Sequence, residues 1–253
     1  MTRQLNRAVA VQEFKGGRLM AKIKEHKGTQ THAVSLITLV DPSSPISEQY
    51  RTIRTNIQFA SSADQQIKTL VITSSGPGEG KSTTSANLAV VFAKSGQRVL
   101  LVDADMRKPT VYKTFNLNNA SGLSTVLSTT TSVLEASQKT VIDNLSVLTS
   151  GPKPPNPSEL LGSSRMNQVI EEARNLYDVV IFDMPPVVAV TDAQIMASKA
   201  DGTLLVVREN VSRKESLAKA KDLLTMVQAR ILGVVYNGAE NSKDSGYYYY
   251  YGN

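Results

Sequence analysis

The residues most suited to chemistry form a short loop of small side chains, Ser74-Ser75-Gly76-Pro77-Gly78-Glu79-Gly80-Lys81-Ser82-Thr83. Such a loop lets successive backbone N–H groups wrap an anion, and a helix that begins at its end directs its N-terminus to the same charge. The lysine would reach the β- and γ-phosphates of a nucleotide, and the Ser82 hydroxyl would bind Mg²⁺. The predicted nucleotide-binding residues of the loop are Ser75, Gly76, Pro77, Gly78, Glu79, Gly80, Lys81, Ser82 and Thr83.

One position of the loop departs from the strict phosphate-loop motif. The motif has a glycine six residues before the lysine, and that position here is Ser75. Serine is small, and Gly76 and Gly78 keep the loop permissive. A glycine-rich turn alone can be a mere connector, but here it lies between an apolar run and a helical pattern. That order favours a nucleotide site.

Three carboxylates follow two other apolar runs. Asp103 ends the run at 98–103, Asp105 lies two residues beyond it, and Asp183 ends the run at 179–183. In an open parallel sheet the carboxyl ends of the strands face the ligand crevice, so these acids are expected to converge on the phosphates and on Mg²⁺. Each could instead be a helix cap or a surface residue. The predicted metal ligands are Ser82, Asp105 and Asp183.

Apolar runs alternate with helical patterns from residue 68 onward. The predicted strands cover residues 68–74, 98–103, 145–148, 179–183, 203–207 and 231–237, and the predicted helices cover 46–61, 82–95, 163–175, 192–199 and 214–229. Continuous apolar runs of this kind suit strands that are buried on both faces. The pattern therefore predicts an α/β fold, a doubly wound, mostly parallel sheet with helices on both faces.

Composition excludes several other kinds of site. The 253 residues include no cysteine, which rules out disulfides, thiolate metal sites and a cysteine nucleophile. Both histidines, His26 and His32, lie in the polar N-terminal region, which makes a histidine-based site improbable. The chain has neither a membrane-spanning apolar run nor a secretory signal, so a cytoplasmic location is expected.

The loop and the two strand-end motifs, LLVDADMR at 100–107 and VVIFDMPP at 179–186, resemble the three Walker-type motifs of the bacterial tyrosine kinases. These are P-loop enzymes related to the MinD and ParA ATPases. The resemblance implies an ATP-dependent protein-tyrosine kinase that uses ATP and Mg²⁺. It assigns catalysis to Lys81, Asp103, Asp105 and Asp183, with Asp103 as the candidate for accepting or orienting the proton of the incoming tyrosine hydroxyl. The sequence does not decide how the roles divide between Asp103 and Asp105.

The C-terminal tyrosine cluster extends the resemblance. Five consecutive tyrosines follow a polar lead-in, and the predicted phosphate acceptors are Tyr247, Tyr248, Tyr249, Tyr250 and Tyr251. The resemblance implies autophosphorylation in trans within a ring. It also implies a role in ring formation for Glu48, Arg51 and Arg54, which match the family's Glu-x-x-Arg-x-x-Arg segment. At helical spacing, an ordinary exposed ion pair explains the first two equally well.

Asn237 and Gly76 bear on the rival functions. Asn237, at the end of the last predicted strand, matches the place where related ATPases contact adenine, although a turn residue beside Gly238 is an equal alternative. MinD and ParA proteins carry an extra lysine where this chain has Gly76. That difference counts against the alternative function, a MinD/ParA-like ATPase without kinase activity. A binding module that holds nucleotide as a structural ligand is a third hypothesis.

We divide the chain into three predicted parts. Residues 1–40 form a basic N-terminal segment, for which derivation from an activator and an unremarkable extension are equal alternatives. Residues 41–240 form a P-loop kinase domain, and residues 241–253 form a flexible tyrosine-cluster tail. Seven basic and two acidic residues lie within 1–28. The resemblance implies a transmembrane activator that recruits the kinase to the inner face of the cell membrane, a tyrosine phosphatase, protein substrates and a role in capsule or exopolysaccharide synthesis. No nucleic-acid partner is expected.

Overall fold

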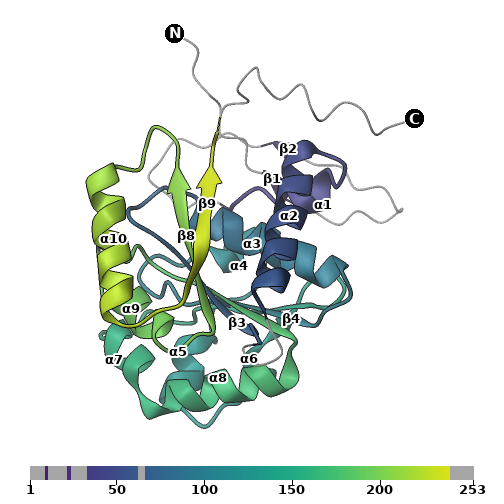
Figure 1. Ribbon diagram of the computed structural model, residues 1–253. Helices are drawn as coiled ribbons and strands as arrows, with labels where there is room; N and C mark the ends of the chain where they lie inside the picture. Colours follow the sequence, from purple (N-terminus) through teal and green to yellow (C-terminus); the bar gives the residue numbers. More distant parts are fainter. Residues whose placement is uncertain (1–8, 11–21, 24–32, 62–65, 240–253) are drawn as a thin grey trace, which may run out of the picture.

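A seven-stranded sheet forms the centre of the molecule (Figure 1). The structure, a computed structural model, describes residues 9–10, 22–23, 33–61 and 66–239. The strand order is β5-β6-β4-β7-β3-β8-β9, and all neighbouring strands are parallel except the edge pair β5 and β6. The strands are β3 (Thr69–Ser74), β4 (Val99–Asp103), β5 (Gln138–Lys139), β6 (Leu145–Leu148), β7 (Val179–Asp183), β8 (Gly202–Arg208) and β9 (Ile231–Asn237). A separate antiparallel pair joins β1 (Val9–Ala10) to β2 (Lys22–Ile23).

Helices cover both faces of the sheet (Figure 1). One face packs against α1 (Ile37–Val40), α2 (Pro45–Ala60), α3 (Lys81–Lys94) and α4 (Val111–Thr114). The other packs against α5 (Leu123–Ser128), α6 (Val133–Ala136), α7 (Pro157–Gly162), α8 (Ser164–Leu176), α9 (Asp192–Ala197) and α10 (Lys214–Met226). None of the helices in the described part of the chain is long and apolar enough to cross a membrane. The predicted doubly wound α/β fold is confirmed.

The central strands bury side chains on both faces, which explains their continuous apolar sequences. In β3, Leu70 and Ile72 join the core beneath α3, whereas Val71 joins the core on the opposite face. The same alternation occurs in β4, where Leu101 faces α3 and Leu100 faces away from it. Because successive residues of a strand point to opposite faces, an apolar residue is required at every position.

The six predicted strands are all present, with ends within one residue of the prediction. The five predicted helices are also present. The prediction missed the short strands β1, β2 and β5 and the short helices α1, α4, α5 and α6, because segments of two to six residues show no measurable periodicity.

Residues 33–40 lie against the helix that follows the phosphate loop. The backbone N–H of Thr38 donates to Asn87 Oδ1 at 3.0 Å, and Lys94 Nζ donates to the carbonyl of Thr38 at 2.9 Å. The N–H of Val34 donates to Thr114 Oγ1, in α4, at 3.2 Å. These residues therefore pack with the sheet, while the boundaries at residues 40 and 240 stay predictions. The tyrosine tail, 241–253, lies outside the described residues.

Candidate active site

The strand order brings the two carboxylate motifs beside the phosphate loop. Strand β7 lies between β4 and β3, and the register places Asp183 beside Asp103 on one side and beside Ile72 on the other. The loop begins two residues after Ile72, at the end of β3. All three strands are parallel, so the loop and both acids meet at the same edge of the sheet.

Two glycines give the phosphate loop its shape. Gly78 has φ of 75° and Gly80 has φ of 102°, a left-handed conformation that favours glycine. A β-carbon at Gly80 would also lie 2.0 Å from Asn237 Nδ2. This amide nitrogen donates to the Glu79 carbonyl at 3.1 Å. Asn237 is thus placed against the phosphate loop, and its contact with adenine stays a prediction.

The Glu79 side chain turns into the loop and is only 2% exposed. Its carboxylate accepts hydrogen bonds from the Ser75 hydroxyl at 2.8 Å, from the Gly76 N–H at 3.0 Å and from the Ser212 hydroxyl at 2.6 Å. The serine that replaces the usual glycine therefore has a bonding partner within the loop. Sequence reasoning missed Ser212, because nothing local marks a serine 133 residues away from Glu79 as its partner.

Asp183 is fully buried at the end of β7. Its Oδ1 accepts a hydrogen bond from Ser85 Oγ at 3.0 Å, and its Oδ2 has no hydrogen-bond partner among the described residues. Burial raises the pKa of Asp183 to about 6, although the nearby Ser82 hydroxyl and the charge of Lys81 lower it. A cation beside the free oxygen would favour the charged form.

Asp103 is also fully buried, at the end of β4. Its Oδ2 accepts the backbone N–H groups of Thr110, at 3.1 Å, and of Val111, at 3.0 Å, so the beginning of α4 orients the carboxylate. Its Oδ1 has no hydrogen-bond partner in the described part of the chain. Burial, and then the neighbouring charge of Asp183, raise the pKa of Asp103 well above its usual range.

These residues fit a site for Mg²⁺. The unpartnered Oδ2 of Asp183 is buried and suits a cation, and Ser82 adds a hydroxyl at the start of α3. Asp105 is half-buried and accepts the N–H of Lys108 at 3.0 Å. Among the described residues no three acidic or histidine side chains gather closely enough to hold a metal. Mg²⁺ is commonly bound by one or two carboxylates with substrate phosphates and water, which suits this arrangement.

Arg107 forms an ion pair within the fold. Its Nε and second terminal nitrogen each donate to the Asp192 carboxylate at 2.9 Å. The Asp192 side chain is fully buried, whereas 37% of the Arg107 side chain is exposed. Arg107 therefore has a structural role, as the cation that neutralises a buried carboxylate.

Replacing Arg107 by alanine is expected to destabilise the protein by about 2–4 kcal/mol, because it leaves the buried Asp192 carboxylate without its cation. Adding Asp192→Asn should restore most of that loss, since the amide removes the unpaired charge. Urea unfolding of the single and double variants measures the effect. Equal stability of Arg107→Ala and the double variant would contradict this account.

The residues predicted to join subunits have partners within the chain. Arg51 Nε lies 2.6 Å from Glu48 Oε2, and both terminal nitrogens of Arg51 donate to the Pro42 carbonyl at 3.0 Å. Arg54 donates to the carbonyl of Val91, in α3, at 3.3 Å. The first pair is the i,i+3 ion pair expected of a helix surface. The role of these residues in a ring stays a prediction.

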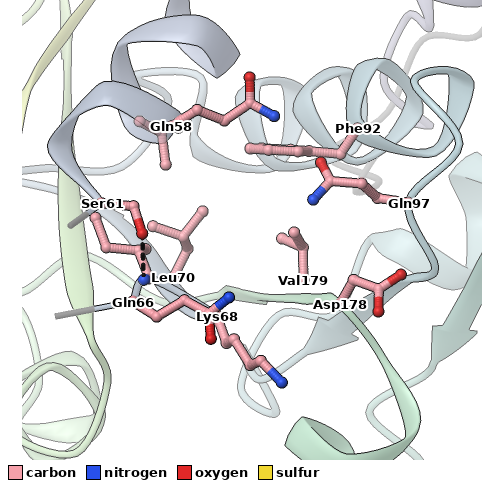
Figure 2. A pocket seen from close by; sticks show the side chains of 11 residues that line it. Gln58, Ser61, Gln66, Lys68, Leu70, Phe92, Gln97, Asp178 and Val179 are labelled. Atoms are coloured by element: carbon pink, nitrogen blue, oxygen red, sulfur yellow. Dashed lines mark hydrogen bonds between the residues drawn. The ribbon is translucent and has the colours of Figure 1, made fainter. Parts of the chain in front are cut away.

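A cavity of about 470 Å³ is lined by residues outside the phosphate loop, and Figure 2 shows its lining side chains. Its wall includes Lys68 and Asp178, which precede β3 and β7, so it opens at the amino ends of the strands. The lining residues are Ile57, Gln58, Ser61, Gln66, Ile67, Lys68, Leu70, Phe92, Gln97, Asp178 and Val179. The phosphate loop and the two acids lie at the carboxyl ends, so this cavity is separate from them.

Comparison with known proteins identifies a family and a curated relative that match most of the chain. The family described as AAA domain matches residues 67–231. Tyrosine-protein kinase YwqD of Bacillus subtilis (strain 168) is 51% identical over 228 residues, which cover 90% of this chain and 95% of that protein.

Two solved structures extend the comparison. The chimerical protein CapA2B2 superposes with a TM-score of 0.76 at 45% identity, covering 79% of this chain and 88% of that one. The cell division ATPase MinD of Pyrococcus furiosus gives 0.59 at 27% identity, covering 70% of this chain and 74% of that one. With a phosphate loop, two strand-end carboxylates and a close relative of nearly its full length, the chain belongs to the bacterial tyrosine-protein kinases of the P-loop type.

Proposed function

We propose that this kinase transfers the γ-phosphoryl group of ATP to Tyr247, Tyr248, Tyr249, Tyr250 and Tyr251 of a neighbouring copy in a ring. The observation that carries the proposal is the meeting of the phosphate loop with Asp103 and Asp183, two buried carboxylates that each keep one unpartnered oxygen. One oxygen is suited to a cation and the other to a proton, the two charges that tyrosine phosphorylation must handle.

Lys81 and the loop amides would hold the β- and γ-phosphates, while Ser82, Asp105 and Asp183 would hold Mg²⁺. When bound, Mg²⁺ neutralises phosphate charge. A free tyrosine hydroxyl has a pKa of about 10 and stays protonated at neutral pH. Asp103 Oδ1 accepts that proton as the tyrosine oxygen bonds to the γ-phosphorus and the bond to the ADP oxygen breaks. The raised pKa of Asp103 makes it a stronger base than an exposed aspartate.

The length of the tail is compatible with transfer between copies. Tyr247 lies ten positions after Asn237 in the sequence, a reach of at most about 33–36 Å. A tether of this length allows contact with an adjacent copy, and the resemblance to the family favours that copy as the acceptor. Glu48, Arg51 and Arg54 would join the copies. Each phosphate adds a charge of about −1.5 to −2, so repeated phosphorylation would loosen the ring by repulsion.

The remaining partners follow from the family and from the basic N-terminal segment. A transmembrane activator would recruit the kinase to the inner face of the cell membrane, and a tyrosine phosphatase would reverse the tail phosphorylation. Protein substrates in capsule or exopolysaccharide synthesis would be regulated in this way. The charge of residues 1–28 suits an anionic membrane surface.

A mixing experiment tests transfer between copies. A full-length Lys81→Met chain keeps its tail tyrosines. Its own kinase activity should fall about 100- to 1000-fold, because the substitution removes the cation that binds the phosphates. It is mixed with a chain of different size whose five tail tyrosines are phenylalanines, in the presence of labelled ATP and Mg²⁺. Label is expected on the Lys81→Met chain. If wild-type protein labels its tail and the mixture does not, transfer between copies is wrong. Free phosphate without tyrosine label would indicate the MinD/ParA-like ATPase, and neither product would indicate a binding module.

A further inference from the structure

Glu79 is a buried carboxylate that takes no part in the proposed phosphoryl transfer. It lies within the phosphate loop, yet its side chain points into the protein and is 2% exposed. A carboxylate so close to bound phosphates would repel them if it faced the nucleotide. A buried charge persists only where hydrogen bonds compensate for its lost hydration.

Three donors provide that compensation, and they come from two segments of the chain. Ser75 and Gly76 belong to the phosphate loop, and their donations close the loop upon itself. Ser212 belongs to the segment 209–213, which we call the β8–α10 loop. The carboxylate thus joins two loops that are distant in sequence. Hydrogen bonds to an ionised group are roughly twice as strong as neutral ones.

Other contacts join the same two segments. The backbone N–H of Arg208 donates to Ser212 Oγ at 2.8 Å, which holds this hydroxyl in place as it donates to Glu79. A terminal nitrogen of Arg208 donates to the Gly78 carbonyl at 3.0 Å. Asn237 holds the Glu79 carbonyl from the end of β9. The loop is therefore bound on its outer side at consecutive positions, which leaves its inner side to the nucleotide.

We propose that Glu79 is a positioning residue that clamps the phosphate loop to the β8–α10 loop in the shape that receives the phosphates of ATP. The inference rests on the proposed use of ATP. Ser75 belongs to the clamp because its hydroxyl donates to Glu79. Glycine, which the motif has at this position, could not make that hydrogen bond. Because the Gly76 N–H is committed to Glu79, the phosphate-binding amides lie further along the loop, towards α3.

Loss of the clamp is expected to weaken nucleotide binding. Glu79→Ala is expected to raise both the Kd of a fluorescent ATP analogue with Mg²⁺ and the KM for ATP at least tenfold, with less than a threefold change in kcat. Glu79→Gln should raise them less, because a flipped amide keeps all three bonds: its oxygen accepts from Gly76 and its NH₂ group donates to the two serines. Ser212→Ala removes one bond and should raise them about threefold. Glu215→Ala, at an exposed glutamate of α10, is the matched control.

A merely structural role predicts a different pattern. It would lower the melting temperature and leave the KM and Kd of the folded fraction unchanged, which would overturn the proposal. Tighter nucleotide binding by Glu79→Ala would also overturn it, since Glu79 would then obstruct the loop. If Glu79→Ala fails to fold, the graded Kd values of Glu79→Gln and Ser212→Ala decide. Binding is measured without tyrosine phosphorylation, so a wild-type chain that binds ATP and labels no tyrosine would refute the proposed function and leave this comparison intact.

Discussion

Replacing Asp183 by asparagine is expected to abolish tyrosine phosphorylation, with a loss of at least about 1000-fold in turnover. The substitution removes a negative charge that would hold Mg²⁺ against the phosphates and keeps the hydrogen bond from Ser85, since the amide oxygen replaces Oδ1. Tail labelling over a range of Mg²⁺ concentrations measures the effect. Activity that recovers fully at high Mg²⁺ would mean that Asp183 contributes affinity for the ion and nothing to turnover.

The same substitution should stabilise the protein in the absence of Mg²⁺ and nucleotide. The pKa of Asp183 rises from an ordinary 3.8 to about 6 on folding, so the folded state binds its proton more tightly than the unfolded state. Stability from this group therefore falls as the pH rises from about 4 to about 6. At pH 8, Asp183→Asn should gain up to about 3 kcal/mol, at 1.36 kcal/mol for each pKa unit.

Urea unfolding at pH 8 and near pH 4 tests this expectation. The advantage of the variant should shrink as the pH falls and should also shrink at pH 8 when Mg²⁺ and ATP are added to both proteins. Ser85→Ala provides a control, since it removes a partner of the carboxylate without removing the charge. A variant that is less stable than wild type at pH 8 would show that the Asp183 charge is already compensated in the free protein.

Asp103→Asn is the second change with a large expected effect, a fall in kcat of about 100- to 10,000-fold with little change in the KM for ATP. The asparagine oxygen can still accept from Thr110 and Val111, so the orientation set by α4 is kept. What is lost is the oxygen that we propose takes the tyrosine proton. Measuring kcat and KM separately, over a range of pH, distinguishes proton acceptance from nucleotide binding.

Asp105→Asn is the comparison variant for that experiment. Its carboxylate is half-buried and is predicted to act on the metal, so its loss should raise the Mg²⁺ requirement more than it lowers the maximal rate. If Asp103→Asn instead needs more Mg²⁺ and has normal turnover at saturating Mg²⁺, Asp103 would act on the metal, and the roles assigned to the two acids would have to be exchanged.

The sequence predicted the sheet and the loop well because both follow from local patterns. Strands buried on both faces must be apolar at every position, as Leu70, Val71 and Ile72 illustrate. The shape of the loop is evident from its motif, because Gly78 and Gly80 occupy the positions that need a positive φ. The acids at strand ends were placed by one rule about parallel sheets.

No local sequence pattern indicates the contacts between distant segments. The Ser212 partner of Glu79 and the α4 amides that hold Asp103 depend on how loops return to the sheet edge, and α4 itself spans only four residues. The hydrogen bond from Ser85 to Asp183 was also not predictable. Ser85 lies on the same helix as Ser82, but its partner belongs to β7, which is distant in sequence. Local sequence predicts which groups reach the site, while tertiary contacts decide how each carboxylate is held.

The contact between Asn237 and the phosphate loop fixes the point from which the proposed acceptor tail starts. The Asn237 amide donates to the Glu79 carbonyl and abuts Gly80, so the chain leaves the fold within bonding distance of its own nucleotide loop. In a ring, every acceptor cluster would be tethered a short linker's length from the next active site, and tethers of this kind give local concentrations in the millimolar range. Tail labelling by assembled rings should then be first order and insensitive to dilution, until dilution separates the subunits.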